Sequence, residues 1–269
     1  MKANTETPKG LLDRRHSESK FKLARYDPID THVAAFVSHY WVVTWDLTGL
    51  PPYESESLPY PNVHLAFQRG MSGIFGPPRG KFVRRLEGRD RVFGISFRPG
   101  GFHPVAQAPV YRFSNRRTLV SDVFGQDGLT VEEAILRTER AEEQIALSEA
   151  FLRSRNLRFD PAIAFATRVV DKIAADRMLL RVEDVAHAEG VSRRKLERIF
   201  RHYVGVSPKW VVQRYRLFEA ADRLATDSDV DAADLAQQLG YCDQAHFIKD
   251  FKAMVGCSPA DYARKAAAP

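Results

Sequence analysis

The chain has 269 residues, 44% of them hydrophobic, and a mean hydropathy of −0.34, values typical of a globular protein long enough for two domains. No apolar run approaches the ~20 residues of a membrane-spanning helix, which excludes the class of integral membrane proteins. The two cysteines, Cys242 and Cys257, form no CxxC motif, so neither a disulfide framework nor a cysteine zinc site is expected.

The first twenty residues are polar and lack the apolar segment of a secretory signal, so we expect a loose leader on a cytoplasmic chain. Residues 33–124 contain short apolar or alternating runs separated by turn residues, a pattern that predicts strands. We therefore expect a β-rich sandwich or barrel. Its core should contain most of the aromatic side chains of these runs, among them Tyr40, Trp41, Trp45, Phe67 and Phe97.

The chain changes character after these strands. Residues 131–153 place apolar side chains among Glu and Arg at helical spacing, which predicts one or two amphipathic helices. Asp160 and Pro161 then form a helix start, and the following helix should extend to about Ala175. The sequence predicts an α+β chain with a β-rich domain over residues 20–158, connector helices included, and an all-α domain over 159–266.

The all-α part contains an internal sequence repeat of two copies. Three residues of the first copy match the second at an offset of fifty, and six more match at fifty-one. Each copy contains a small alanine in a first helix, a glycine turn, and Ser192 or Asp243 as the N-cap of a second helix. These are the parts of a helix-turn-helix unit. The matched positions are Asp184, Ala186, Gly190, Ser192, Leu196, Phe200, Gly205, Ser207 and Pro208, with Asp234, Ala236, Gly240, Asp243, Phe247, Phe251, Gly256, Ser258 and Pro259.

The second helix of the first copy has two distinct faces. Its apolar face consists of Leu196, Ile199, Phe200 and Tyr203. The opposite face consists of Arg194, Glu197, Arg198 and Arg201. Residues 192–216 hold eight basic side chains, Arg214 and Arg216 included, against one acid, a net charge of +7. An ordinary solvated helix face is the alternative, but this excess of positive charge favours DNA contact.

The residue types suggest separate roles on DNA. Arg194 and Arg198 can bind guanine edges in the major groove, and Glu197 can accept a hydrogen bond from cytosine. Basic side chains at the edges of the stripe are suited to phosphates, which fix register without reading sequence. The complete predicted set in this copy is Ser192, Arg193, Arg194, Lys195, Glu197, Arg198, Arg201 and Lys209.

The second copy has fewer basic residues. Gln244 can read adenine, Ala245 or Ile248 can contact a thymine methyl, and Lys249 and Lys252 can bind phosphates. His246 completes the set, and a capped surface helix without DNA contact is the alternative. A helix of about seventeen residues that starts at Pro208 joins the copies; at ~1.5 Å per residue it spans ~25 Å. Both second helices could then enter successive major grooves, ~34 Å apart, from one side of the duplex.

These tandem units, with GxSP after each second helix, RLFEAADRL in the joining helix and DLAQQLGYCDQAHFIKDFKAMVGCSPADYAR at the end, resemble the DNA-binding domain of AraC/XylS-type transcriptional regulators. The resemblance covers residues 160–265 and implies base or backbone contacts at Arg194, Glu197 and Arg198, and at Gln244, Ala245, His246 and Lys249. Ala245 stands where a polar side chain is common in that family. The segments YPNVHLAFQRG and GISFRPGGFHPV more loosely resemble a cupin-like effector domain, which implies small-molecule sensing or dimerisation.

The predicted partner is double-stranded promoter DNA; RNA polymerase, a small-molecule effector and a second copy of the chain are further candidates. We expect no cofactor and no catalytic residue, because the sequence contains no nucleophile elbow, HExxH or phosphate-binding glycine loop.

The alternative is a small-molecule-binding or metal-dependent β-barrel with a helical protein-interaction tail. Its candidate metal ligands are His32, His39, His64 and His103, which lack the HxH spacing of a metal-binding cupin, so no metal is expected. A repair protein that accepts alkyl groups would need reactive cysteines in the front half, which has none. The pair Gly100-Gly101 is interpreted as a turn.

Overall fold

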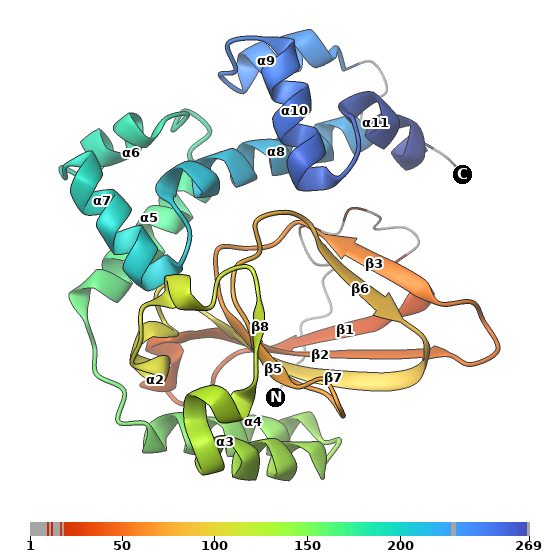
Figure 1. Ribbon diagram of the computed structural model, residues 1–269, viewed down its shortest axis with the longest axis vertical. Helices are drawn as coiled ribbons and strands as arrows, with labels where there is room; N and C mark the ends of the chain where they lie inside the picture. The colour runs from red at the N-terminus through yellow and green to blue at the C-terminus, as the bar shows by residue number, and fades with distance from the viewer. Residues whose placement is uncertain (1–9, 11, 13–16, 18, 227–229, 268–269) are drawn as a thin grey trace.

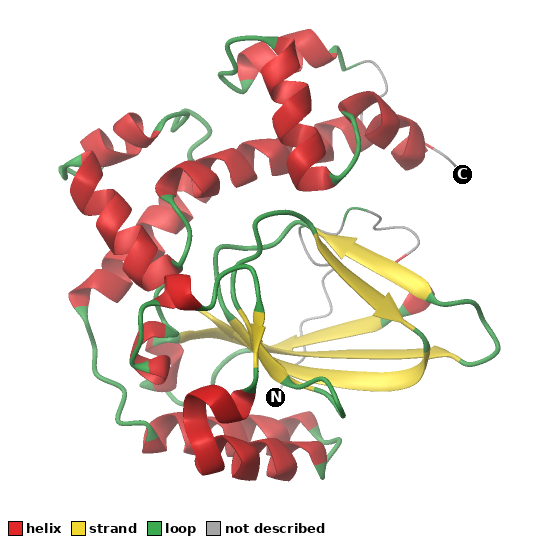
Figure 2. Cartoon of the chain, viewed as in Figure 1, coloured by secondary structure: helices red, strands yellow, loops and turns green. Residues whose placement is uncertain are grey.

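The computed structural model describes residues 10, 12, 17, 19–226 and 230–267. A strand-rich half precedes a helical half, as predicted (Figures 1 and 2). In Figure 1 the sheet lies in the middle layer, with α3 and α4 below it and helices α5–α11 above it. In the part of the chain that is described, no helix combines the length and the apolar composition needed to cross a bilayer.

The strands of the front half form two antiparallel sheets. The larger sheet has six strands in the order β1-β2-β7-β4-β5-β8, and the smaller one is a two-stranded ribbon of β3 and β6. The strand bounds are β1 Lys22–Tyr26, β2 Val37–Leu47, β3 Tyr53–Ser57, β4 His64–Phe67, β5 Gly73–Phe75, β6 Phe82–Leu86, β7 Gly88–Phe97 and β8 Arg117–Thr118.

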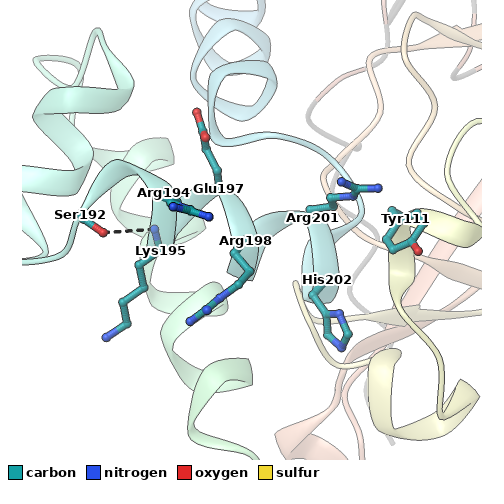
Figure 3. A pocket seen from close by; sticks show the side chains of 8 residues that line it. All are labelled: Tyr111, Ser192, Arg194, Lys195, Glu197, Arg198, Arg201 and His202. Atoms are coloured by element: carbon teal, nitrogen blue, oxygen red, sulfur yellow. Dashed lines mark hydrogen bonds between the residues drawn. The ribbon is translucent and has the colours of Figure 1, made fainter.

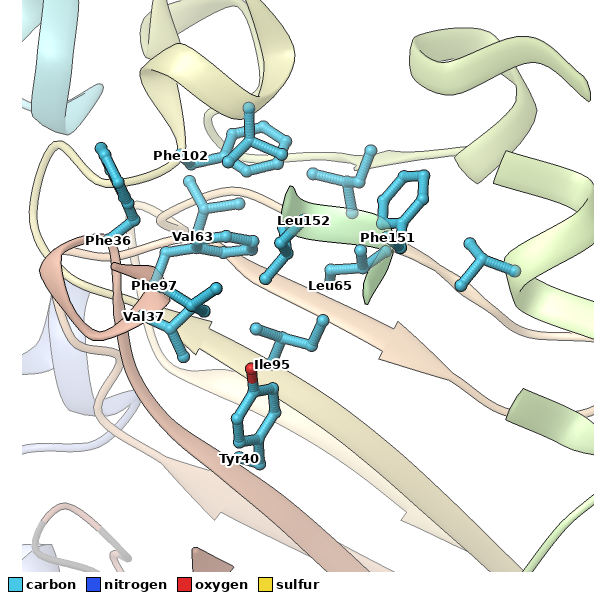
Figure 4. Close-up of a cluster of buried hydrophobic side chains, with 14 of the residues drawn as sticks. Phe36, Val37, Tyr40, Val63, Leu65, Ile95, Phe97, Phe102, Phe151 and Leu152 are labelled. Atoms are coloured by element: carbon cyan, nitrogen blue, oxygen red, sulfur yellow. The ribbon is translucent and has the colours of Figure 1, made fainter. Parts of the chain in front are cut away.

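Alternation along the strands divides the side chains between the two faces of the large sheet. On one face Tyr40, Leu65, Ile95 and Phe97 pack against the connector helices, and Leu152 of α4 is fully buried among them (Figure 4). On the other face Trp45, Leu47 and Val92 form a smaller cluster with Leu86 and Tyr53 of the ribbon. Trp41 is half-buried there, whereas the other four aromatic residues expected in the core are buried.

The structure adds elements that the sequence reading missed and corrects one region. Strands β1 and β3 were not predicted, because KLARY follows the polar leader and YESES contains few apolar residues. Residues 120–124 were grouped with the strands but begin a helix, α3 (Val120–Leu136), which packs against α4 (Ala141–Ser154). Gly125, at φ 57° and ψ −137°, interrupts the helical backbone. Because the helix is kinked there, one helical periodicity does not extend through the whole segment.

The turn predicted at Gly100-Gly101 is present, but it leads into a short helix, α2 (His103–Ala106), rather than a hairpin. A Cβ atom on Gly101 would lie 2.1 Å from the carbonyl oxygen of Phe36, so only glycine fits this approach of two backbone segments. The short helix η2 (Val110–Arg112) follows α2, and both lie against the helical half.

The helical half follows the predicted pattern closely. Helix α5 covers Pro161–Ala175, and Asp160 caps it by accepting a hydrogen bond of 2.8 Å from the amide of Ala162. The joining helix α8 covers Pro208–Thr226 and has nineteen residues. The other helices are α6 Val182–Ala188, α7 Arg193–Ile199 with its π-helical continuation η3 Phe200–Val204, α9 Ala232–Gln238, α10 Gln244–Val255 and α11 Pro259–Ala267.

The two halves touch at several points. Thr167 donates to the carbonyl of Pro99 at 2.9 Å, and Trp210 donates to the carbonyl of Arg79 at 3.1 Å. Leu58, which follows β3, is buried in the core of the second helix-turn-helix copy. The predicted domain boundary near residue 158 lies in the connection between α4 and α5, and it stays a prediction.

Candidate DNA-binding surface

Both copies of the repeat build the same turn. Gly190 and Gly240 adopt φ values of 62° and 75°, which side chains with a Cβ rarely tolerate. In each copy the residue after the glycine donates to the small alanine of the first helix: Val191 to Ala186 and Tyr241 to Ala236, both at 3.0 Å. These bonds satisfy free carbonyls at the end of the first helix. The duplicated sequence therefore specifies a duplicated helix-turn-helix geometry.

The second helix of each unit is capped as predicted. The Ser192 hydroxyl accepts from the amide of Lys195 at 3.3 Å, and the Asp243 carboxylate accepts from the amide of His246 at 2.7 Å. Both helices also end alike, at Gly205 with φ 90° and at Gly256 with φ 95°. The equivalent residues at both ends fix the same length of recognition helix in the two copies.

The faces of the first recognition helix lie as the helical wheel predicts. Leu196 and Phe200 are fully buried in the core of this unit, whereas all four residues of the charged face are exposed. Among the described residues, Arg194, Lys195 and Arg198 form no side-chain hydrogen bond or ion pair. They border a groove of about 680 Å³ with Ser192, Glu197, Arg201, His202 and Tyr111 (Figure 3). Three cations thus face open space without an internal partner.

Two of the predicted DNA-contacting residues are already paired with each other. The Arg193 guanidinium donates to Glu197 at 2.8 Å and to Glu183 of α6 at 2.7 Å. Glu197 in particular raises the pKa of Arg193. All three side chains are exposed, so water and salt screen these ion pairs. Contact of Arg193 with a phosphate, or of Glu197 with a base, therefore requires exchange of an existing partner.

Two arginines of the basic cluster are placed differently from the sequence expectation. Arg214 is 1% exposed and lies between the halves, so it cannot belong to the charged surface with which its sequence position groups it. Arg216 is half-buried, and burial lowers the pKa of its guanidinium. Arg201 is exposed but its guanidinium lies 4.7 Å from the ring of Tyr111 in the front half (Figure 3).

The second recognition helix presents a smaller set of exposed side chains. Gln244, Ala245, Lys249 and Lys252 are exposed, while Ile248 is half-buried against the core of this unit. His246 is exposed but turned toward its own unit. Its Nε2 lies 3.3 Å from Asp250, and its ring packs edge-on against Tyr241. Of the predicted residues, the two lysines, Gln244 and Ala245 are thus the most accessible to a ligand as large as a duplex.

The two units are held together by more than the joining helix. Gln213 of α8 donates to Asp250 of α10, and a Cβ on Gly240 would lie 2.9 Å from a methyl of Leu180 in the first unit. Lys209 is exposed in the first turn of α8, next to the half-buried Trp210. The contacts of Asp250 and Leu180 were not predictable from periodicity, because each depends on how the two repeats pack.

The four histidines considered as metal ligands are not gathered into one cluster. Across the described part of the chain, no three His, Cys, Asp or Glu side chains come together in a way that could hold a metal ion. Burial lowers the pKa of His39 to about 3 and that of His64 to about 4. His64 Nδ1 accepts from Trp41 Nε1 at 3.2 Å. His103 stacks on His202 and Tyr203 of the helical half.

Comparison with known proteins agrees with this geometry. The family described as "Helix-turn-helix domain" matches residues 185–265, and "Domain of unknown function (DUF6597)" matches residues 25–118. The probable transcription factor PqrA of Proteus vulgaris is 30% identical over 90 residues, which cover 34% of this chain and 73% of PqrA. The chain belongs to the AraC/XylS family of transcriptional regulators.

Two further relatives each match a part of this AraC-family chain. The transcriptional activator AarP of Providencia stuartii is 35% identical over 83 residues, and the chain spans 61% of its length. A solved AraC-type regulator from Chromobacterium violaceum is 26% identical over 38% of this chain and 90% of that one, with a TM-score of 0.34. The matches to PqrA, AarP and this regulator cover 34%, 31% and 38% of the AraC-family chain, so its ligands and partners have to be inferred from its own residues.

Proposed function

We propose that this AraC-family chain is a sequence-specific DNA-binding transcriptional regulator whose front half controls the helical half. The observation that carries the proposal is the exposed face of α7, where Arg194, Lys195 and Arg198 have no internal partner among the described residues. Surface arginines that need no internal carboxylate are available for guanine edges and phosphates. Promoter DNA lies in the bacterial cytoplasm, which is where we place the protein.

The proposed contacts divide between the two units. Arg194 and Arg198 read bases in one major groove, with Glu197 as a second reader once Arg193 shifts to a phosphate. In the second unit Gln244 and Ala245 face bases, and the two lysines bind phosphates. Contact of His246 with DNA requires exchange of an existing partner, because its ring is engaged with Asp250 and Tyr241 and its amide with Asp243. The proposed set is Ser192, Arg193, Arg194, Lys195, Glu197, Arg198, Arg201, Lys209, Gln244, Ala245, His246, Lys249 and Lys252.

Selection of bound duplexes from a random pool, followed by fluorescence anisotropy over a salt series, tests the proposal. We expect Arg198→Ala to weaken binding to the selected duplex by about 1–3 kcal/mol and to lower discrimination against random DNA. Lys249→Ala should reduce the salt slope by about one unit and weaken both duplexes alike. Arg137→Ala is the matched control, because Arg137 is an exposed arginine at the C-cap of α3 that pairs with Glu133.

The result that contradicts the proposal is equal affinity for selected and random duplexes, or an Arg198→Ala protein that binds as the Arg137→Ala protein does. Far-ultraviolet circular dichroism should be unchanged in both variants, since both side chains are exposed and outside the core. Dimerisation through the front half and contact with RNA polymerase remain parts of the proposal that these binding assays do not require.

A further inference from the structure

A second cavity, of about 630 Å³, lies in the front half and shares no lining residue with the groove along α7. Its walls come from the ends of β1, β2, β4 and β7, from the turn between α3 and α4, and from Gln144 in the first turn of α4. It therefore lies where the helix pair stops covering the sheet. A volume of this size falls in the range of small-molecule sites.

Strand register determines which side chains meet in this cavity. Lys22 of β1 pairs with Thr44 of β2, and Thr44 pairs with Arg91 of β7, so the three side chains form one row across the sheet. Two residues further along, Phe93 of β7 pairs with Phe67 of β4. Because side chains two residues apart share a face, the row with Lys22 and Arg91 borders the row with the phenylalanines. Both phenylalanines are 1% exposed and line the cavity.

The cavity carries an excess of positive charge. Its lining includes five basic and three acidic side chains: Lys20, Lys22, Arg69, Arg89 and Arg91, with Asp46, Asp90 and Glu139. Two of the acids are already engaged. Asp90 accepts from Gln68 at 2.6 Å, and Asp46 accepts from the amide of Thr48 at 3.1 Å.

Arg91 is the half-buried member of this group. Within the described residues its side chain forms no hydrogen bond or ion pair, and burial lowers the pKa of its guanidinium. Glu139, which also lines the cavity, attracts this guanidinium but forms no ion pair with it. A half-buried guanidinium without a bonded carboxylate favours an anion from solution.

A buried amide with an unpartnered oxygen also borders the cavity. Gln144 lines the cavity and is 2% exposed. Its Nε2 donates to the carbonyls of Ile135 and Thr138, at 3.1 and 2.8 Å, which fixes the orientation of the amide. Its Oε1 has no hydrogen-bond partner among the described residues. A buried acceptor left without a donor is unfavourable. A donor group of a bound molecule can reach this oxygen after a small shift of the Gln144 side chain.

We propose that this cavity binds a small organic anion, with its carboxylate between Lys22 and Arg91, its apolar body against Phe67 and Phe93, and a hydroxyl or amine near Gln144. The proposal deepens the function proposed above, on which its regulatory meaning rests, by giving the front half a site for an effector. The site lies on the helix-covered face of the sheet, opposite the ribbon of β3 and β6.

Isothermal titration of the full chain with 6-hydroxy-2-naphthoate tests the site, because this probe combines a carboxylate, a flat apolar body and a distant hydroxyl. We expect one site per chain, and a Kd on the order of tenfold higher for Arg91→Gln and for Lys22→Gln. The neutral 6-hydroxy-2-naphthamide should bind more weakly by a similar factor. The matched control is Arg85→Gln, since Arg85 lies in the ribbon, outside the cavity, and pairs with Glu87.

No saturable binding up to about 10 mM probe overturns the proposal, as do naphthoate affinities of Arg91→Gln and Lys22→Gln equal to that of the control. If Arg91→Gln is unfolded by circular dichroism, Lys22→Gln decides the question, because Lys22 is exposed. The titration contains no DNA. Arg198→Ala should bind the probe as wild type does, so failure of this site and failure of DNA binding can be told apart.

Discussion

Arg214 offers the most direct test of how the two halves are joined. Its Nε donates to the carbonyl of Pro59 at 2.9 Å, and its guanidinium lies 4.3 Å from the ring of Tyr60 and 4.5 Å from that of Tyr215. Arg214→Ala leaves the Pro59 carbonyl without this donor, a loss of about 1–3 kcal/mol, and removes stacking worth about 0.5–2 kcal/mol. Burial of a guanidinium without a carboxylate is itself unfavourable and lowers its pKa, which offsets part of that loss.

We therefore expect Arg214→Ala to reduce the free energy of unfolding by about 2–4 kcal/mol, seen as a lower midpoint in thermal unfolding followed by circular dichroism. The control is Arg177→Ala, because the exposed side chain of Arg177 also contacts α8, through an ion pair of 3.2 Å with the half-buried Glu219. That exposed pair should contribute less than about 1 kcal/mol. The reasoning is refuted if Arg214→Ala is no less stable than Arg177→Ala.

Two further predictions concern other buried contacts. Gly205→Ala should lower stability by about 1–3 kcal/mol in urea unfolding, because its Cβ would lie 2.7 Å from Ser114 Oγ at a φ of 90°; Gly190→Ala, at φ 62° with nothing within 4 Å, isolates the backbone effect and should lose less. Burial lowers the pKa of His64 to about 4, so as the pH falls the unfolded state takes up the His64 proton before the native state does. The stability that His64 contributes is therefore complete above about pH 6.5 and is lost as the pH falls toward 4. His64→Gln should flatten the pH dependence of stability in that window by up to about 1.4 kcal/mol per pH unit, and an unchanged slope would count against a neutral imidazole at this half-buried position.

The features predicted correctly depend on local chemistry. Helix caps and glycine turns depend on a few neighbouring residues. The structure contains the predicted caps at Asp160, Ser192 and Asp243 and the glycines at both turns. The wheel of α7 also predicted its exposed face, because helix geometry alone decides which side chains point together.

The features missed depend on contacts between distant segments. Arg214 has the charge of a DNA-contacting residue, but the fold of the front half covers α8 at that position. Tyr111 lies more than eighty residues before α7, yet borders the same groove. Strand β3 pairs with β6 across an insertion that contains β4 and β5, and its polar sequence gives no sign of that pairing. Packing of this kind has no signature within a window of neighbouring residues.

The duplicated frame also explains how a single front half can act on both recognition helices. Gly205 and Gly256 occupy equivalent positions, each at the turn that ends a recognition helix. Gly205 lies against Ser114 and Val110, whose contact includes a hydrogen bond of 2.7 Å from Ser114 to the Gly205 carbonyl. Gly256 lies against Lys81, the residue immediately before β6.

The same corner of each repeat thus contacts the front half, at two separate places. A shift of the loop around Ser114 relative to Lys81 would turn one recognition helix with respect to the other only if the Gln213–Asp250 bond and the packing of Gly240 on Leu180 also change. In the proposed DNA complex the two helices meet successive grooves of one duplex, so a small change in their relative orientation is expected to alter DNA affinity. A ligand in the front half can regulate binding only if its affinity differs between the two orientations, so effector and operator must influence each other's affinity reciprocally.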